Sequence, residues 1–150
     1  MGALAIMHLD MYLTAWETMV RLGHWADETG DSRMLECLTE WPMVYNIASV
    51  IANRACPLHT NKFGHPQWLD LLLTVGEYSD LRFVLPTIGY ELQYNPGTVL
   101  ALSGQLLEHG VSIADGERGV VSFYMHDNVH EFMDVVRCNY MEYQNAGREL

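Results

Sequence analysis

The sequence predicts one mainly β domain of the α+β class, a sandwich or barrel with helices before and after it in the chain. Between residues 45 and 127, short β-prone runs alternate with Gly, Pro, Asn and Asp. The connections between these runs have antiparallel lengths, and no βαβ unit is visible. A chain of 150 residues is enough for one core. We therefore expect a single domain 1–150, with helical support from 1–44, a β core at 45–127 and a C-terminal helix at 128–150.

Apolar side chains three or four residues apart predict the helices at both ends. In residues 3–22 they are Leu4, Met7, Met11, Ala15, Met19 and Leu22, and in the tail they are Val129, Phe132, Met133, Val136 and Tyr140. Gly23 is expected to stop the first helix. Ser32 is expected to cap a second, short helix, which Pro42 ends.

Seven strands are expected in the β core. Their ranges are 44–52, 69–75, 82–85, 90–94, 98–102, 106–111 and 120–125. Turn residues separate them at Gly76-Glu77, Pro86-Thr87, Asn95-Pro96-Gly97, Gly104 and Asp115-Gly116. Because the strands are short and closely spaced, they favour a closed or two-layered antiparallel sheet over an open parallel one.

The net charge of the chain argues against one class of function. Lys and Arg total 8 against 19 Asp and Glu, which gives a formal charge of −11, and Lys62 is the only lysine. Nonspecific nucleic-acid binding depends on cationic side chains that displace counterions from phosphates. The acidic composition therefore disfavours binding of long duplex DNA by this chain alone. It does not exclude one local basic groove.

The sequence also predicts the compartment. No uncharged stretch reaches the roughly 20 apolar residues that a membrane-spanning helix needs. The apolar start of the chain lacks the basic flank and cleavage site of a secretory signal. The three cysteines, Cys37, Cys56 and Cys138, form no CxxC motif and no even-numbered framework, which favours a reducing environment. We expect an intracellular protein, nuclear or cytoplasmic, without membrane contact.

His59, Asn61, His109 and Arg118 form the most informative pattern in the chain. An octahedral Fe(II) that binds both a bidentate keto-acid and O2 has three positions left for protein ligands, and two imidazoles with one carboxylate fill them. In extended backbone, positions 59 and 61 point to the same side, and His109 follows 50 residues after His59. Arg118, near the start of an expected strand, has the guanidinium that binds a carboxylate with two hydrogen bonds. The alternative is that these histidines are satisfied structural groups.

Four runs of sequence carry a family resemblance. They are SVIANRACPLH (49–59), HPQWLDLLLTVGEY (65–78), YNPGTVLALSGQLLEHGV (94–111) and GERGVVSFYMHDNVHE (116–131). In order and spacing these runs resemble the catalytic core of the TET/JBP-like Fe(II) and 2-oxoglutarate-dependent dioxygenases, notably the fungal group. The resemblance covers more than half of the chain and is strongest over residues 45–131. Residues 1–44 contribute nothing distinctive.

The resemblance implies a fold, an activity and a set of cofactors. The fold is a double-stranded β-helix, also called a jelly roll and shared with the cupins. The activity is oxidation of a C–H bond, such as the methyl group of 5-methylcytosine or thymine in nucleic acid, with Fe(II), 2-oxoglutarate and O2. By position, His59 and His109 would be catalytic iron ligands, Asn61 the third metal position, and Arg118 the catalytic anchor of 2-oxoglutarate. A base substrate would be flipped into the pocket.

Asn61 departs from the family pattern, which has an aspartate at this position. Three outcomes are open: Asn61 binds the metal weakly through its oxygen, it leaves a position for water or another anion, or the site is inactive. Asp70 and Asp127 are nearby acids, but Asn61 is the preferred third position because facial coordination is geometrically strict. Two alternatives to the dioxygenase therefore remain. One is a catalytically impaired jelly roll that serves in binding or oligomerisation, and the other is a cupin-like domain that holds a different metal without 2-oxoglutarate.

Overall fold

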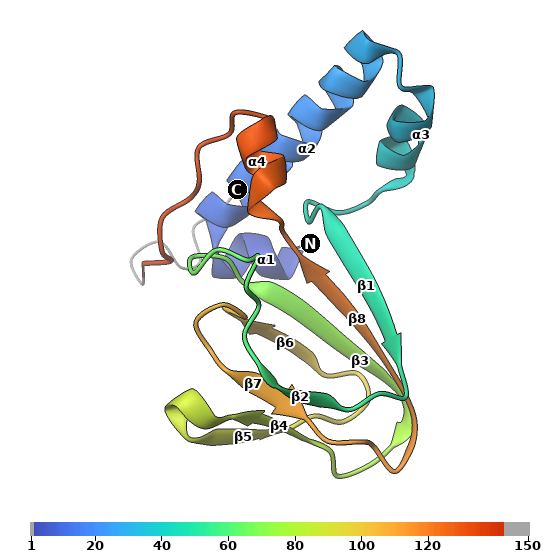
Figure 1. The fold of residues 1–150 in the computed structure, drawn as a ribbon, viewed down its shortest axis with the longest axis vertical. Coiled ribbons are helices and arrows are strands. Elements are labelled where there is room, and N and C mark those ends of the chain that lie inside the picture. Colours follow the sequence, from blue (N-terminus) through green and yellow to red (C-terminus); the bar gives the residue numbers. More distant parts are fainter. Residues whose placement is uncertain (1, 143–150) are drawn as a thin grey trace. The chain divides into compact units, whose positions relative to one another are not determined.

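The computed structural model describes residues 2–142 and separates into two compact units. Among the described residues, the helical unit consists of 2–46 and 126–142, and the β unit is Ile47–Met125. The elements follow the expected order, with α-helices at the two ends and antiparallel strands between them (Figure 1), and one short 3-10 helix, η1 Pro86–Ile88, lies among the strands. The prediction of an α+β chain is confirmed at this level. Within residues 2–142, no helix has the length and apolar character needed to cross a membrane.

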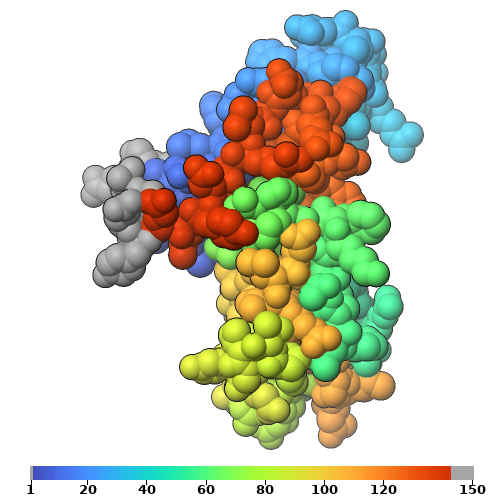
Figure 2. All heavy atoms as spheres, turned by 60° about the vertical axis from the view of Figure 1, so that its left-hand side comes forward, coloured from blue at the N-terminus to red at the C-terminus, as the bar shows by residue number. Residues whose placement is uncertain are grey.

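The β unit consists of eight strands in two antiparallel four-stranded sheets (Figure 1). The strands are β1 Ile47–Ala52, β2 Cys56–His59, β3 Asp70–Tyr78, β4 Arg82–Leu85, β5 Tyr90–Gln93, β6 Val99–Leu102, β7 His109–Val111 and β8 Gly116–Tyr124. One sheet has the order β1-β8-β3-β6 and the other the order β2-β7-β4-β5. Figure 2 shows the surface over the second sheet, where the green to teal residues of β2, the orange residues of β7 and the yellow-green residues of β4 and β5 lie side by side.

The expected set of seven strands was wrong in two respects, and glycines explain one of them. Gly76 and Gly116 were expected in turns, but they lie inside β3 and at the start of β8, with φ angles of 133° and 129°. A Cβ at Gly76 would overlap the carbonyl of Glu117, and a Cβ at Gly116 would overlap that of Glu77. These glycines therefore allow two long paired strands to approach closely, which is another common use of glycine within sheets.

The second difference is the extra strand β2, which was not expected. It has four residues, contains Pro57, and pairs with β7 through a register shift between Cys56 and His59. Proline and an irregular register are both features of short edge strands. Conversely, the strand expected at 106–111 begins only at His109, because the residues before it form a turn.

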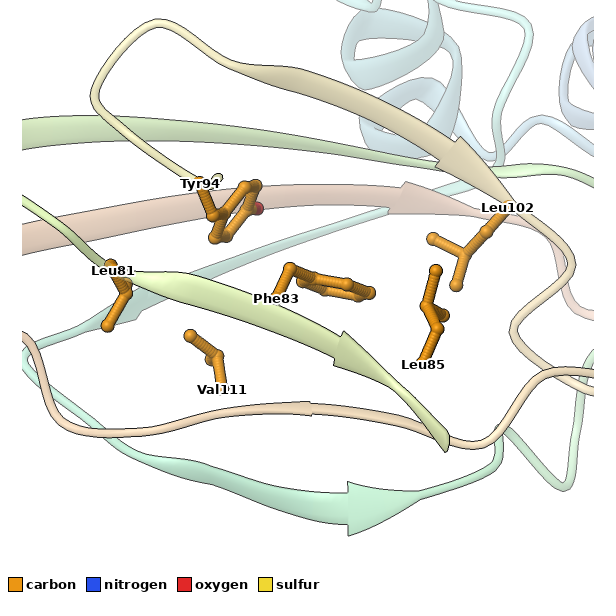
Figure 3. Packing of buried hydrophobic residues seen from close by; sticks show 6 residues of the cluster. All are labelled: Leu81, Phe83, Leu85, Tyr94, Leu102 and Val111. Atoms are coloured by element: carbon orange, nitrogen blue, oxygen red, sulfur yellow. The ribbon is translucent and has the colours of Figure 1, made fainter. Parts of the chain in front are cut away.

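Six buried apolar residues form a core cluster in the β unit (Figure 3). They are Leu81, Phe83, Leu85, Tyr94, Leu102 and Val111. On β4, Phe83 and Leu85 are buried whereas Arg82 is exposed, as the two-residue period of a half-buried strand requires. Because this cluster draws residues from β4, β6 and β7 and from the residue after β5, it holds strands of both sheets together.

The helical unit has four helices, α1 Gly2–Met7, α2 Leu9–Thr29, α3 Ser32–Glu40 and α4 Asp127–Phe132. The first helix was expected to be continuous and to stop at Gly23, but it breaks at His8 and α2 runs through to Gly30, whose φ is 71°. Asp31 rather than Ser32 caps α3, with its side chain accepting from the backbone N–H of Met34 at 3.0 Å.

The C-terminal helix expected over 128–150 was too long. It ends at Phe132, and residues 135–142 have no regular structure, while 143–150 lie outside the described residues. Arg21 of α2 donates hydrogen bonds to the carbonyls of Met133 and Asp134 at 3.1 and 2.8 Å. These bonds satisfy two of the carbonyl groups that lie just beyond the end of α4.

His130 makes the helical unit sensitive to acid. Its ring is 1% exposed, and Nδ1 lies 2.8 Å from the hydroxyl of Thr18 on α2. Burial lowers the pKa of His130 to about 4, against the opposing effect of Asp127. An unfolded histidine titrates near its ordinary value of about 6.5, so the unfolded state binds more protons between these two values. The contribution of His130 to the free energy of unfolding should therefore fall as the pH drops through this window.

We expect the stability of His130→Gln relative to the unmodified chain to increase by on the order of 3 kcal/mol as the pH falls from 6.5 to 4. Denaturant titrations of both proteins, followed by the helical circular-dichroism signal and repeated across the window, measure this difference. The glutamine can still bond Thr18, so similar stability near neutral pH serves as the control. A difference that does not change with pH would show that His130 does not contribute to the acid sensitivity.

Candidate metal centre

His59 and His109 lie opposite each other on neighbouring strands. They are register partners in the antiparallel pair β2 and β7, and their ring centroids are 4.4 Å apart. His59 is the last residue of β2 and His109 the first residue of β7. Cross-strand partners have their side chains on the same face of the sheet. The fold thus brings together two imidazoles that the sequence separates by 50 residues.

Backbone carbonyls determine which ring nitrogen is available on each histidine. Nδ1 of His59 lies 2.9 Å from the carbonyl oxygen of Pro57, and Nδ1 of His109 lies 2.8 Å from that of Leu107. A carbonyl only accepts, so each Nδ1 carries a proton, and in the neutral form of the ring Nε2 keeps its lone pair. Burial lowers the pKa of His109, and the neighbouring His59 lowers it further. Imidazoles oriented through Nδ1 are the usual arrangement of metal-binding histidines.

Aromatic side chains connect this pair to Arg118. Phe83 stacks on His109, with centroids 5.6 Å apart and 11° between the planes, and meets Tyr94 edge-on at 5.2 Å. The guanidinium carbon of Arg118 lies 5.5 Å from the centroid of the Tyr94 ring. The histidines and the arginine therefore flank one aromatic cluster inside the β unit.

Arg118 is a buried cation without an anionic partner among residues 2–142. It is 6% exposed, and Nη1 donates to the carbonyl of Arg54 at 3.2 Å. Its Nε has no hydrogen-bond partner in this part of the chain, and no carboxylate there forms an ion pair with it. A buried charge is costly unless it is paired. The arrangement suits an anionic ligand.

Asn53, which the sequence did not single out, holds the backbone of Arg118. Its side-chain oxygen accepts from the Arg118 N–H at 2.7 Å, and its own N–H donates to the Arg118 carbonyl at 2.8 Å. Asn53 has a φ of 49°, a conformation that asparagine tolerates better than most residues. An asparagine directly after a β-prone run was the only sequence signal for this role.

Cys56 lies between the histidine pair and Arg118. Its Sγ is 3.6 Å from Nδ1 of His59, and the charge of Arg118 acts on the thiol. Burial raises the pKa of Cys56, although the charges of Arg118 and Arg54 oppose the shift. The thiol is therefore neutral near pH 7, which makes it a weak metal ligand and a poor nucleophile.

Asn61 follows β2 and contacts an acid. Its Nδ2 donates to Oδ2 of Asp70 at 2.7 Å, and its backbone N–H donates to the carbonyl of Gly104 at 2.8 Å. Asp127 lies in the helical unit, where it begins α4 and pairs with Arg137. Within residues 2–142, no group of three or more His, Cys, Asp and Glu side chains is placed to hold a metal ion. Among the described residues, the two histidines thus have no acidic third ligand.

The buried carboxyl of Asp70 gives a test that needs no metal. Burial raises its pKa from 3.8 to about 6, although the hydrogen bond from Asn61 opposes the shift. The folded state then binds more protons than the unfolded state between these values, so this group lowers stability as the pH rises through the window. We expect the stability of Asp70→Asn relative to the unmodified chain to increase by on the order of 3 kcal/mol from pH 4 to pH 7. Parallel urea titrations of the two proteins measure this change. If the stability difference between them does not vary with pH, Asp70 is not a buried carboxyl group with a raised pKa.

Comparison with models of protein families finds no match, and comparison with curated proteins finds no significantly similar sequence. No family assignment therefore follows from these comparisons. Any function has to be inferred from the chain's own residues and from the geometry of the β unit.

Proposed function

We propose that the β unit is a double-stranded β-helix and that the chain is a non-haem Fe(II) and 2-oxoglutarate-dependent dioxygenase of the TET/JBP type. The strand order supports this fold. Eight antiparallel strands in two sheets ordered β1-β8-β3-β6 and β2-β7-β4-β5 are what a jelly roll of two Greek keys requires. In such a roll, residues distant in sequence come to lie on neighbouring strands, as His59 and His109 do on β2 and β7 of one sheet.

The observation that carries the proposal is the pair of imidazoles with both Nδ1 atoms bonded to backbone carbonyls. This pair fits a divalent metal, because in the neutral rings a proton on Nδ1 leaves the Nε2 lone pair for coordination, although Nε2 of His59 also lies 4.0 Å from Sγ of Cys56. Arg118 fits the second component, since its buried guanidinium has no carboxylate partner among the described residues. In this assignment His59 and His109 hold the metal, and Arg118 donates to the distal carboxylate of 2-oxoglutarate.

The proposed chemistry is oxidation of a C–H bond. When bound, Fe(II) would activate O2 together with 2-oxoglutarate. One oxygen atom would enter the substrate C–H bond as a hydroxyl group, and the other would enter succinate, which forms with carbon dioxide from 2-oxoglutarate. Phe83 and Tyr94 give the site an apolar wall, which keeps bulk water from the reacting centre. The proposed substrate is a nucleobase-containing molecule such as DNA, oxidised at the methyl group of 5-methylcytosine or thymine.

Succinate formation tests the activity. Protein loaded with Fe(II) under nitrogen is mixed with 2-oxoglutarate and air, with and without a methylated oligonucleotide, and succinate is quantified. We expect succinate above the level of a chelator-treated control, with an increase when the oligonucleotide is present. Absence of succinate at saturating 2-oxoglutarate would contradict the enzymatic proposal.

A second candidate function is a metal-binding or keto-acid-binding module that has lost turnover. The absence of an acidic third ligand within residues 2–142 favours it, because a neutral amide withholds the anion that helps to hold a dication. This module would bind Mn²⁺ and 2-oxoglutarate and form no succinate. Binding and turnover measured on the same preparation separate the two functions.

A further inference from the structure

A buried carboxylate holds the side chain of Asn61. Asp70 begins β3, pairs in register with Leu102 of β6 and is 6% exposed. Its Oδ2 accepts a hydrogen bond of 2.7 Å from Nδ2 of Asn61. An asparagine on a loop would otherwise sample both orientations of its planar amide, so this contact restricts a group that the sequence alone leaves free.

The chemistry of the contact selects one orientation. An ionised carboxylate has only acceptors, whereas an asparagine amide has a donor branch and an acceptor branch. Turning the Asn61 amide by half a rotation would place its oxygen against the oxygen of Asp70, with two acceptors facing and no proton between them. Asp70 therefore retains the nitrogen branch, and Oδ1 is the branch left for a ligand.

The turn before β7 leaves room for this pair. Gly104 accepts the backbone N–H of Asn61 at 2.8 Å, and a Cβ at Gly104 would overlap both Nδ2 of Asn61 and Oδ2 of Asp70. The hydroxyl of the adjacent Ser103 donates to the carbonyl of Pro66 at 2.9 Å. The loop that carries Asn61 is thus fixed at two points to the same turn, which limits movement of the amide.

We propose that Asp70 is a positioning residue that presents Oδ1 of Asn61 as the third, neutral ligand of the metal held by His59 and His109. The inference rests on the proposed function, because it assumes a metal on this histidine pair. In the TET/JBP-type pattern, an aspartate carboxylate binds the metal directly. Here the carboxylate of Asp70 would contact the metal only through Asn61, to which it is hydrogen-bonded. It acts through the amide, which it orients and polarises.

Metal titration of the unloaded protein tests the positioning. Mn²⁺ is added to the metal-free chain at or above neutral pH, and binding is followed by calorimetry. We expect Asp70→Asn to weaken Mn²⁺ binding by about 10-fold or more, the effect of losing a partner that orients a ligand. Glu77→Gln removes one carboxylate from the exposed part of the same strand, so it controls for net charge and should leave binding unchanged.

A second variant separates position from charge. Gly104→Ala retains the carboxylate of Asp70 but places a methyl group between it and Asn61, so we expect a comparable loss of Mn²⁺ affinity. A readout without metal accompanies Gly104→Ala, because an amide at position 70 can still accept the bond from Nδ2 of Asn61. In nitrogen-labelled protein, the side-chain NH2 signal of Asn61, assigned through its loss in Asn61→Ala, should move towards the position of an exposed amide.

The outcomes distinguish this inference from the proposed function. If Asp70→Asn and Gly104→Ala bind Mn²⁺ as tightly as the unmodified chain while His109→Ala does not bind, the metal site stands and the positioning role is wrong. If the Asn61 signal does not change in Gly104→Ala, which places a methyl group against both atoms of the bond, the hydrogen bond is absent in solution and the inference fails. If the unmodified chain binds no metal, both proposals fail.

Discussion

Replacing Arg118 by methionine is expected to weaken 2-oxoglutarate binding by at least about 100-fold, while Mn²⁺ affinity stays within about two-fold. The guanidinium is the only proposed partner of the distal carboxylate, and two charge-assisted hydrogen bonds to it contribute about 3 kcal/mol or more. The guanidinium that this change removes is not one of the proposed metal ligands, so metal binding should be little affected. Calorimetric titration of the Mn²⁺-loaded protein with 2-oxoglutarate measures the loss.

Stability provides the second readout for Arg118. Its charge is buried without an anionic partner in residues 2–142, so an apolar side chain of similar length should maintain or increase the free energy of unfolding. Arg82→Met, at an exposed position on β4, is the matched control and should change neither binding nor stability. A large loss of stability in Arg118→Met, together with equal loss of metal and keto-acid binding, would assign the arginine a structural role instead.

Restoring a carboxylate at position 61 is expected to tighten metal binding, but only in part while Asp70 is present. Asn61→Asp places a second carboxyl within hydrogen-bond distance of Asp70, and two like charges in contact raise the pKa of one of them. We therefore expect only about a 10-fold gain in Mn²⁺ affinity from the single change.

The double variant Asn61→Asp with Asp70→Asn reverses the hydrogen bond and keeps the net charge of the pair. The amide at position 70 then donates to the new carboxylate, which faces the metal without a neighbouring anion. We expect at least about a 100-fold gain over the unmodified chain and higher succinate production. Equal Mn²⁺ affinity in all three proteins would show that position 61 lies outside the coordination sphere.

The sequence predicted the kinds of element better than their limits, and the reasons are local. Periodicity located α2 and most strands, because burial on one face imposes it. It could not reveal β2, whose four residues include a proline and a bulge. Nor could it distinguish a turn glycine from Gly76 and Gly116, which serve close strand approach. That distinction depends on the paired strand, which is distant in the sequence: Gly76 pairs with Arg118, and Gly116 pairs with Tyr78.

For the candidate site too, the sequence suggested some residues, whereas other relationships became visible only in the structure. Spacing and family resemblance suggested His59 and His109, and the structure places their rings together. Their roles as metal ligands stay predictions, as does that of Arg118. Asp70 was weighed as a replacement ligand, whereas the structure shows it bonded to Asn61. A hydrogen bond between a loop and a strand end has no sequence signature, so this relationship could come only from three-dimensional contacts.

The most direct measurement of the central claim is the visible absorption spectrum of the protein with Fe(II) and 2-oxoglutarate under strict exclusion of oxygen. A keto-acid chelated to Fe(II) gives a weak charge-transfer band that neither component gives alone. We predict that the band appears in the unmodified chain, saturates with 2-oxoglutarate and is missing from Arg118→Met at the same concentrations. No band at millimolar Fe(II) and 2-oxoglutarate would mean that His59, His109 and Arg118 do not assemble the proposed site.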